Sequence, residues 1–131
     1  MEDGKELSLV LWDTSGQESY RLNSLKICKS VQGILICFDL AKYYPFGTIK
    51  LWLDEIKIYE NNENIPILLV GNKSDKLSDR EITKEEGIEF AKKCSIPYYC
   101  EASAKYKINI ENAILFFANK VYKNVKEIFF N

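Results

Sequence analysis

Histidine is missing from this sequence altogether. No imidazole is therefore available as a general base or as a metal ligand. The four cysteines form no Cys-x-x-Cys pair, so nothing indicates a zinc site of the usual ligand spacing. We predict instead that the cysteines are buried free thiols of a cytosolic protein, namely Cys28, Cys37, Cys94 and Cys100.

An excess of charge of one sign is also missing. The 18 Lys and Arg residues nearly balance the 19 Asp and Glu residues, which leaves a net charge of −1. There is thus no basic surplus to bind nucleic acid or an anionic membrane. No apolar run approaches the length of a signal-peptide core or a membrane span, so we expect a cytoplasmic chain without an intrinsic membrane segment. Length and composition predict one soluble domain over residues 1–131.

A phosphate-binding loop of the form Gly-x-x-x-x-Gly-Lys-[Ser/Thr] is the third absence. Gly4 and Lys5 cannot form one, because too few residues precede them and Glu6 follows. Such a loop supplies the backbone N–H groups and the lysine that hold phosphates in many α/β enzymes. Without it, and without a catalytic histidine, an unrelated α/β phosphate-binding enzyme is disfavoured.

The sequence does contain a short apolar run that ends abruptly in a polar turn. Residues 67–71 leave no alternating polar face, which predicts a strand buried on both sides in a parallel sheet. The turn then lies at the carboxyl end of the strand, where open α/β sheets bind their ligands. This position favours Asn72, Lys73 and Asp75 as recognition residues.

Other segments complete an α/β pattern. The apolar stretch at 33–40 predicts a second buried strand, and the stretch at 97–101 predicts a third strand. Alternation over 7–12, after a turn signal at 3–5, predicts another. Helices are predicted from Pro45 to the polar stretch at 61–64, from a capping box at 83–86 to Cys94, and from Asn109 onward, with a loop and a short helix over 16–30. The expected fold is α/β, with a mostly parallel sheet flanked by helices.

Apolar residues recur at helical spacing in the two longest helices. In the helix after Pro45, Trp52 and Tyr59 could form a functional aromatic box. A buried core stripe is favoured instead, formed by Ile49, Trp52, Leu53, Ile56 and Tyr59. The last helix has a similar predicted stripe, formed by Ile110, Ala113, Ile114, Phe117, Val121 and Val125.

Three motifs carry a resemblance to a known family. Asn-Lys-Ser-Asp at 72–75 resembles the guanine-reading motif of Ras-superfamily GTPases, Trp-Asp-Thr-Ser-Gly-Gln-Glu at 12–18 resembles the opening of switch II, and Glu-Ala-Ser-Ala-Lys at 101–105 resembles the second base-binding loop. All three occur in the family's order, each at the end of a predicted strand, which makes the match specific. It covers about residues 3–125 and is closest to the Rab branch. Residues 86–93 and 101–103 further resemble the subgroup linked to endoplasmic reticulum and lipid droplets.

The resemblance implies a base-reading role for the first of these loops. Guanine differs from adenine by its N1–H and N2 amino donors, and the carboxylate of Asp75 would accept from both. Asn72 would tie the two loops together and meet the edge of the base, while the stem of Lys73 would lie along the purine face. For Asn72 and Asp75 alone, a polar turn chosen for its turn chemistry is an equally good explanation. The presence of the motif at 101–105 as well favours guanine reading over this explanation.

The same resemblance implies roles for the loop at 103–105. Backbone amides near Ala104 would hold the guanine oxygen, Ser103 would fix the loop, and Lys105 would cover the base. The implied ligand is thus a guanine nucleotide, GTP or GDP.

The switch II motif implies residues for phosphate chemistry. Asp13 resembles the family's Mg²⁺ partner, acting through a water, the Gly16 amide would meet the γ-phosphate, and Gln17 would orient the attacking water. Ser15 stands where the family usually has Ala, which places a hydroxyl beside the phosphate site. Because phosphoryl transfer also needs the missing loop, we expect this chain to bind and hydrolyse GTP poorly.

The resemblance also implies an incomplete Ras-like fold that lacks its first two strands, its first helix and switch I. The missing first strand would lie between the strands predicted at 7–12 and 33–40, which opens a gap of roughly 10 Å, or two strand spacings. We therefore expect the strand at 7–12 to have no partner.

The implied function is that of a Rab-like small GTPase, a switch in vesicle-mediated protein transport whose partners are effectors, exchange factors and GTPase-activating proteins. A complete family member would lie on endomembranes, but no cysteine follows Cys100, so we expect no C-terminal prenylation site. The alternative is a non-catalytic module, derived from a GTPase, that uses its switch II and helical surfaces to bind partners.

Overall fold

The computed structural model describes residues 6–16, 21–59 and 65–130. Its centre is a sheet of three parallel strands in the order β1 (Ile34–Asp39), β2 (Ile67–Asn72) and β3 (Tyr98–Glu101). The helices in this part of the chain are α1 (Arg21–Ile27), α2 (Phe46–Tyr59), α3 (Lys84–Lys93) and α4 (Ile110–Phe130). The predicted α/β fold is confirmed, and the observed sheet is wholly parallel.

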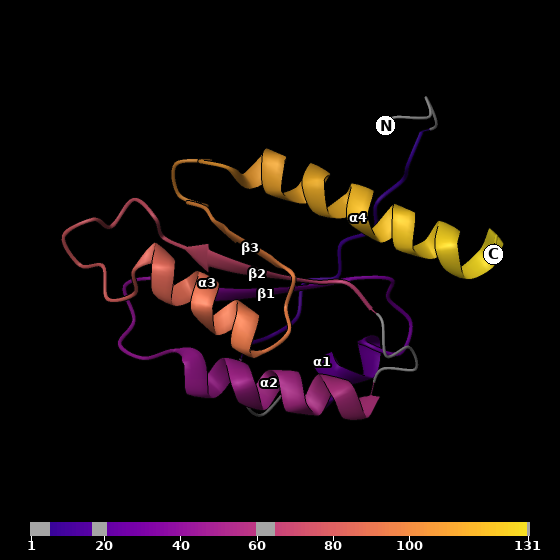
Figure 1. The fold of residues 1–131 in the computed structure, drawn as a ribbon, viewed down its shortest axis with the longest axis horizontal. Coiled ribbons are helices and arrows are strands. Elements are labelled where there is room, and N and C mark those ends of the chain that lie inside the picture. Colours follow the sequence, from indigo (N-terminus) through magenta and orange to yellow (C-terminus); the bar gives the residue numbers. More distant parts are fainter. Residues whose placement is uncertain (1–5, 17–20, 60–64, 131) are drawn as a thin grey trace.

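Helices cover the sheet on both faces, with α4 on one side and α2 and α3 on the other (Figure 1). Each face has its own apolar cluster. The cluster under α2 and α3 contains Phe38, Leu40, Ile49, Leu53, Leu69, Ile82, Ala91 and Ile96. The smaller cluster under α4 contains Leu68, Val70, Ala102 and Phe117. Two packed layers thus hold the strand ends in fixed positions.

The central strand β2 is buried on both faces, as predicted. Its residues alternate between the two clusters, with Leu69 facing α2 and α3 and with Leu68 and Val70 facing α4. Leu69 is 0% exposed. The absence of a polar face in the sequence therefore reflects a strand between two helical layers.

The strand β1 is less buried than predicted, because it lies at an edge of the sheet. Phe38 and Leu40 are buried under α2 and α3, but Leu35 is 38% exposed and Cys37 is also exposed. The cluster under α4 includes residues of β2 and β3 and none of β1. The prediction of a fully buried strand at 33–40 is therefore wrong for one of its two faces.

The prediction of a strand at 7–12 is wrong. Residues 6–16 contain neither helix nor strand, and Leu9 and Leu11 are 44% and 64% exposed. Within the described residues β1 pairs only with β2, so nothing in the sheet is paired with this segment. An alternating pattern without a neighbour to donate and accept hydrogen bonds does not form a strand. The turn signal at 3–5 falls outside the described residues.

The helices follow their sequence signals closely. Pro45 directly precedes α2, and the capping box of α3 is complete: the Glu86 amide donates to Thr83 Oγ1, and the Thr83 amide donates to the Glu86 carboxylate. The short helix expected within 16–30 is α1. The polar stretch expected to end α2, at 61–64, lies outside the described residues, and none of the described helices is long and apolar enough to cross a membrane.

The apolar stripes predicted for α2 and α4 are confirmed in their central residues. Ile49, Leu53 and Ile56 are buried on α2, and Ala113 and Phe117 are buried on α4. The remaining described members are half-buried, Trp52 among them. This packing supports the core interpretation for Trp52, whereas the side chain of Tyr59, the other member of the aromatic box, lies outside the described part of the chain.

The start of β1 also depends on a close approach of α4. A Cβ atom at Gly33 would lie 2.5 Å from Val121 Cγ2, so only glycine fits there without movement of α4.

The cysteines are free, as predicted, but none is fully buried. Cys37 is exposed, and Cys28, Cys94 and Cys100 are half-buried. The prediction of buried thiols is therefore wrong in degree, most of all at Cys37, which lies on the face of β1 that no cluster covers.

Candidate functional site

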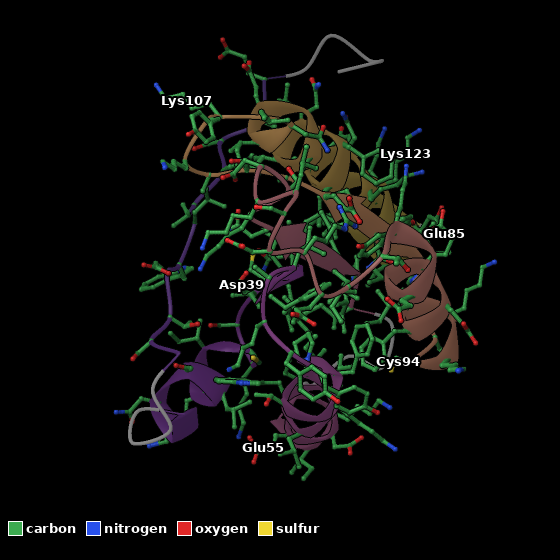
Figure 2. The ribbon with its side chains drawn as sticks, turned by 90° about the vertical axis from the view of Figure 1, so that its left-hand side faces the viewer. Asp39, Glu55, Glu85, Cys94, Lys107 and Lys123 are labelled. Atoms are coloured by element: carbon green, nitrogen blue, oxygen red, sulfur yellow. The ribbon has the colours of Figure 1, made fainter. Side chains whose placement is uncertain are left out.

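The predicted recognition residues gather at the carboxyl edge of the sheet. Figure 2 views the molecule from this edge, with Asp39 near the end of β1 and Lys107 on the segment that leads into α4. β2 ends at Asn72, and Lys73 turns the chain sharply, with a φ of 66° in the left-handed region. The sheet thus presents the turn at 72–75 beside the segment that follows β3.

Two side-chain hydrogen bonds join these segments. Asn72 Oδ1 accepts from the Ala104 amide at 3.1 Å, and Ser103 Oγ donates to Asp75 Oδ1 at 2.5 Å. A backbone bond from the Ser74 amide to the Ala102 carbonyl, 3.0 Å long, lies between them. The turn after β2 and the loop after β3 therefore form one connected unit.

Ser103 is the most enclosed member of this unit. It is 0% exposed, and its hydroxyl also accepts from the Tyr106 amide at 3.2 Å. Backbone hydrogen bonds of 3.0 Å pair Ser103 with Ile108 in both directions and close the loop. A buried hydroxyl with both its donor and its acceptor capacity in use has one orientation, which in turn fixes the Asp75 carboxylate.

The head of Lys73 is held by a residue that sequence reasoning missed. Lys73 Nζ donates to Asp39 Oδ2 at 2.6 Å, and the Ala41 amide donates to Asp39 Oδ1 at 2.9 Å. Partial burial raises the pKa of the Asp39 carboxyl, but these hydrogen bonds and the charge of Lys73 outweigh it and lower the pKa overall. The sequence signal that could have identified Asp39 is its place near the end of the strand predicted at 33–40.

A second group of interacting side chains that the sequence did not indicate lies next to the two segments, and it consists of Arg80, Glu101 and Tyr99. Arg80 donates through both terminal nitrogens to the Glu101 carboxylate, at 2.5 and 3.0 Å, and Tyr99 Oη donates to the same carboxylate at 2.8 Å. Burial raises the pKa of Glu101, but the hydrogen bonds from Arg80 and Tyr99 lower it more. Glu101 stood within a recognised motif, whereas no sequence spacing pointed to Arg80.

Of the predicted phosphate-side residues, the two that the structure describes, Asp13 and Gly16, do not join this unit. Gln17 lies outside the described residues, while Asp13 and Gly16 are exposed in the irregular segment 6–16. Across the described ranges, neither Asp13 nor Gly16 hydrogen-bonds to the two base loops. Although Cys37 is exposed, surrounding protein atoms raise the pKa of its thiol, and the charge of Asp13 raises it further.

Within the described residues the arrangement offers hydrogen-bonding groups to a ligand but no set of metal ligands. The joined loops carry the half-buried carboxylate of Asp75, the backbone amide of Ala104 and the side chains of Lys73 and Lys105. Lys105 Nζ lies 5.1 Å from the centroid of the Tyr106 ring. Magnesium takes six oxygen ligands in a near-octahedral array. In the described part of the chain no group of three or more His, Cys, Asp or Glu side chains could hold a metal, so these residues do not fit Mg²⁺.

Comparison with known proteins gives a match to a family model and matches to many curated proteins. Residues 1–123 match the model of the Ras family. The Ras-related protein RABD1 of Arabidopsis thaliana is 37% identical over 124 residues, which cover 95% of this chain and 60% of the relative. The chain therefore spans about three fifths of the length of that relative.

Proposed function

This chain belongs to the Ras family, in its Rab branch of small GTPases, and from that premise we propose that it recognises guanine nucleotides through the joined loops at 72–75 and 103–105. The observation that carries the proposal is the hydrogen bond between Ser103 and Asp75. It orients the Asp75 carboxylate through a contact within the protein, as preorganisation of a recognition group requires.

Asp75 supplies the selectivity for guanine over adenine. Its carboxylate accepts from the N1–H and N2 amino groups of guanine, donors that adenine does not offer in that pattern. Because Asp75 is half-buried, a base that leaves its carboxylate unpaired loses affinity, by up to about 10⁴-fold in a fully enclosed site.

The neighbouring groups complete the base contacts. The Ala104 amide, which donates to Asn72 Oδ1, is shared with the guanine oxygen, and the stem of Lys73 lies along the purine face. Asp39 holds the Lys73 ammonium at the sheet edge, so that the stem has a fixed direction. Lys105 covers the opposite side of the base.

Phosphate chemistry belongs to a protein that also carries a phosphate-binding loop. There Gly16 would donate its amide to the γ-phosphate, Gln17 would orient water, and Asp13 would face Mg²⁺ through a water. Magnesium, when bound, neutralises charge on the phosphates. The described residues do not assemble its ligands, so we assign the 131-residue chain base recognition rather than turnover.

The cellular role follows from the Rab branch. We propose a molecular switch in vesicle-mediated protein transport that engages effectors, exchange factors and GTPase-activating proteins and acts on endomembranes.

A titration of the 131-residue chain with GTP and Mg²⁺, followed by calorimetry, tests this assignment. The eleven non-hydrogen atoms of guanine, at about 0.3 kcal/mol each, give roughly 3 kcal/mol of binding free energy, which corresponds to millimolar affinity. Micromolar or tighter binding would show that phosphate contacts are made, and would contradict base recognition alone.

A non-catalytic interaction module is the second candidate, and the exposed segment 7–12 favours it. Val10, Leu11 and Trp12 are 74%, 64% and 66% exposed. Consecutive exposed apolar side chains of this kind are typical of a protein interaction site. A chain that binds no guanine base even at millimolar concentration would support this module over the first proposal.

A further inference from the structure

Arg80 and Glu101 form an ion pair beside the joined loops but outside the proposed base contacts. The planar guanidinium binds both carboxylate oxygens, and its Nε donates to the Ile82 carbonyl at 2.6 Å. Both side chains are largely enclosed, at 22% and 16% exposed. A forked, partly buried pair of this kind has one favourable geometry, unlike a flexible surface pair.

The pair connects segments that are anchored on different strands. The amides of Glu81 and Ile82, next to Arg80, donate to the Leu40 carbonyl just after β1, at 2.9 and 3.2 Å. Glu101 is the last residue of β3, and its carbonyl accepts from Asn109 Nδ2 at 2.8 Å. Arg80 therefore ties the exit of the loop at 73–79 to the end of β3.

The loop that carries Asp75 is consequently held at both ends. At its start Asn72 is bonded to Ala104, and at its exit Arg80 is bonded to Glu101. Both partners belong to the same short stretch, 101–104, which contains part of the second base loop. Asp75 lies between the two attachments, so the distance between the loops is set from both sides.

We propose that Arg80 is a positioning residue that acts through Glu101 to hold the loops at 73–79 and 102–105 at the separation needed to read guanine. This inference rests on the proposed function, since it assigns the pair a role in that same site. Loops held in place before the ligand arrives lose less conformational entropy on binding. A pair that served the fold alone would affect global stability without affecting the choice of base.

Three variants separate these possibilities. Arg80→Met removes the ion pair, while Arg80→Lys keeps the charge but cannot form the two-pronged contact. Lys93→Met is the matched control, because it removes a cation from the exposed pair with Glu89 on α3, whose side chains are 70% and 65% exposed. If Arg80→Met does not fold, Arg80→Lys provides the same comparison.

Amide hydrogen exchange of the ligand-free protein is the first measurement. In both Arg80 variants the amides of Ala104 and Tyr106 should exchange at least about tenfold faster, while that of Leu69 in the centre of β2 keeps its rate. The Lys93 control should change none of them. Unchanged exchange at Ala104 would overturn the proposal, and so would an equal acceleration at Leu69, which indicates loss of global stability.

The ratio of guanosine monophosphate to inosine monophosphate affinity, from NMR titration, is the second measurement. Inosine lacks the 2-amino group, so this ratio reports the placement of Asp75. We expect the ratio to fall at least about threefold in Arg80→Lys and to be unchanged in Lys93→Met. An unchanged ratio in Arg80→Lys contradicts the positioning role. If the wild type itself shows no preference for guanine, the proposed function fails, and the exchange data alone decide whether Arg80 holds the loops.

Discussion

Ser103 Oγ donates a hydrogen bond of 2.5 Å to Asp75 Oδ1, across 28 residues of sequence and between the ends of two neighbouring strands. Ser103 has no exposed surface, so water cannot replace this bond. The carboxylate is therefore oriented by the protein itself, and the remaining lone pairs of its two oxygens can accept from a ligand.

Replacing this serine should destabilise the protein. Ser103→Ala removes the bond to Asp75 and leaves the Tyr106 amide without its acceptor. The free energy of unfolding in urea should fall by about 1 to 3 kcal/mol. Ser78→Ala, in the exposed part of the preceding loop, is the control and should change it by less than about 0.5 kcal/mol. Equal effects of the two substitutions would show that the buried hydroxyl of Ser103 contributes no more to the free energy of unfolding than an exposed one.

Gly87 on α3 should not tolerate a methyl group. A Cβ atom there would lie 2.3 Å from Tyr99 Oη, and Tyr99 is itself held by Glu101. Gly87→Ala should therefore cost about 1 to 3 kcal/mol of unfolding free energy, despite the better helix propensity of alanine.

The matched control for that substitution is Gly47→Ala. Nothing lies within 4 Å of a Cβ atom at Gly47, in the first turn of α2. Thermal unfolding should show this variant to be as stable as the wild type or up to about 1 kcal/mol more stable. A stable Gly87→Ala variant would mean that Tyr99 moves freely, against the described network.

The Glu101 carboxylate should make stability depend on pH. Burial raises the pKa of this group, but its bonds to Arg80 and Tyr99 outweigh burial and bring it below the ordinary value of 4.5. A carboxyl with a lowered pKa in the folded state stabilises the fold above its unfolded pKa and loses that effect as pH falls through the folded value.

Glu101→Gln tests this linkage. The variant should be less stable than the wild type at pH 7, and the difference should shrink as pH falls below 4.5. Glu89→Gln, in the exposed pair on α3, should differ little from the wild type at pH 7. A stability difference for Glu101→Gln that is constant from pH 7 to pH 3 would contradict the assignment.

The segment at 6–16 should be the least protected part of the described chain. It has no secondary structure, and Leu9 and Leu11 are exposed. Their amides should exchange close to the rate of an unfolded chain, whereas those of Leu68 and Leu69 should exchange only on global unfolding. Slow exchange at Leu9 and Leu11 would mean that this segment has found a partner strand in solution.

Features of the fold that arise from local or periodic patterns could be predicted. The capping box at Thr83 needs only residues three apart, and β2 lacks a polar face because helices cover both its sides. The burial of β1 could not be predicted in the same way. Its apolar sequence resembles that of β2, but whether a helix covers each face depends on where α4 packs.

The candidate site likewise contains residues that could be predicted from the sequence and residues that could not. The motifs identified Asn72, Asp75 and Ser103, because each lies at the end of a predicted strand. Arg80 lies in a polar loop 21 residues before Glu101, and no periodicity relates the two. Only the parallel order of β1, β2 and β3 brings that loop to the end of β3.

The most direct test of the account is the base preference of Asp75→Asn in the 131-residue chain. The asparagine oxygen can still accept from Ser103, while its NH₂ group faces the ligand as a donor. That donor clashes with the 2-amino group of guanine but pairs with the oxygen that xanthine carries there. The change should cost about 2 to 4 kcal/mol against guanine, with much of it recovered for xanthine.

NMR titrations of wild type and variant with guanosine and xanthosine monophosphates measure this preference, with Asp79→Asn, an exposed position of the same loop, as the control. The account predicts that the wild type and the control prefer guanosine monophosphate and that Asp75→Asn prefers xanthosine monophosphate. Equal weakening of both nucleotides in Asp75→Asn, or no change in either, would contradict it and leave Asp75 as a turn residue.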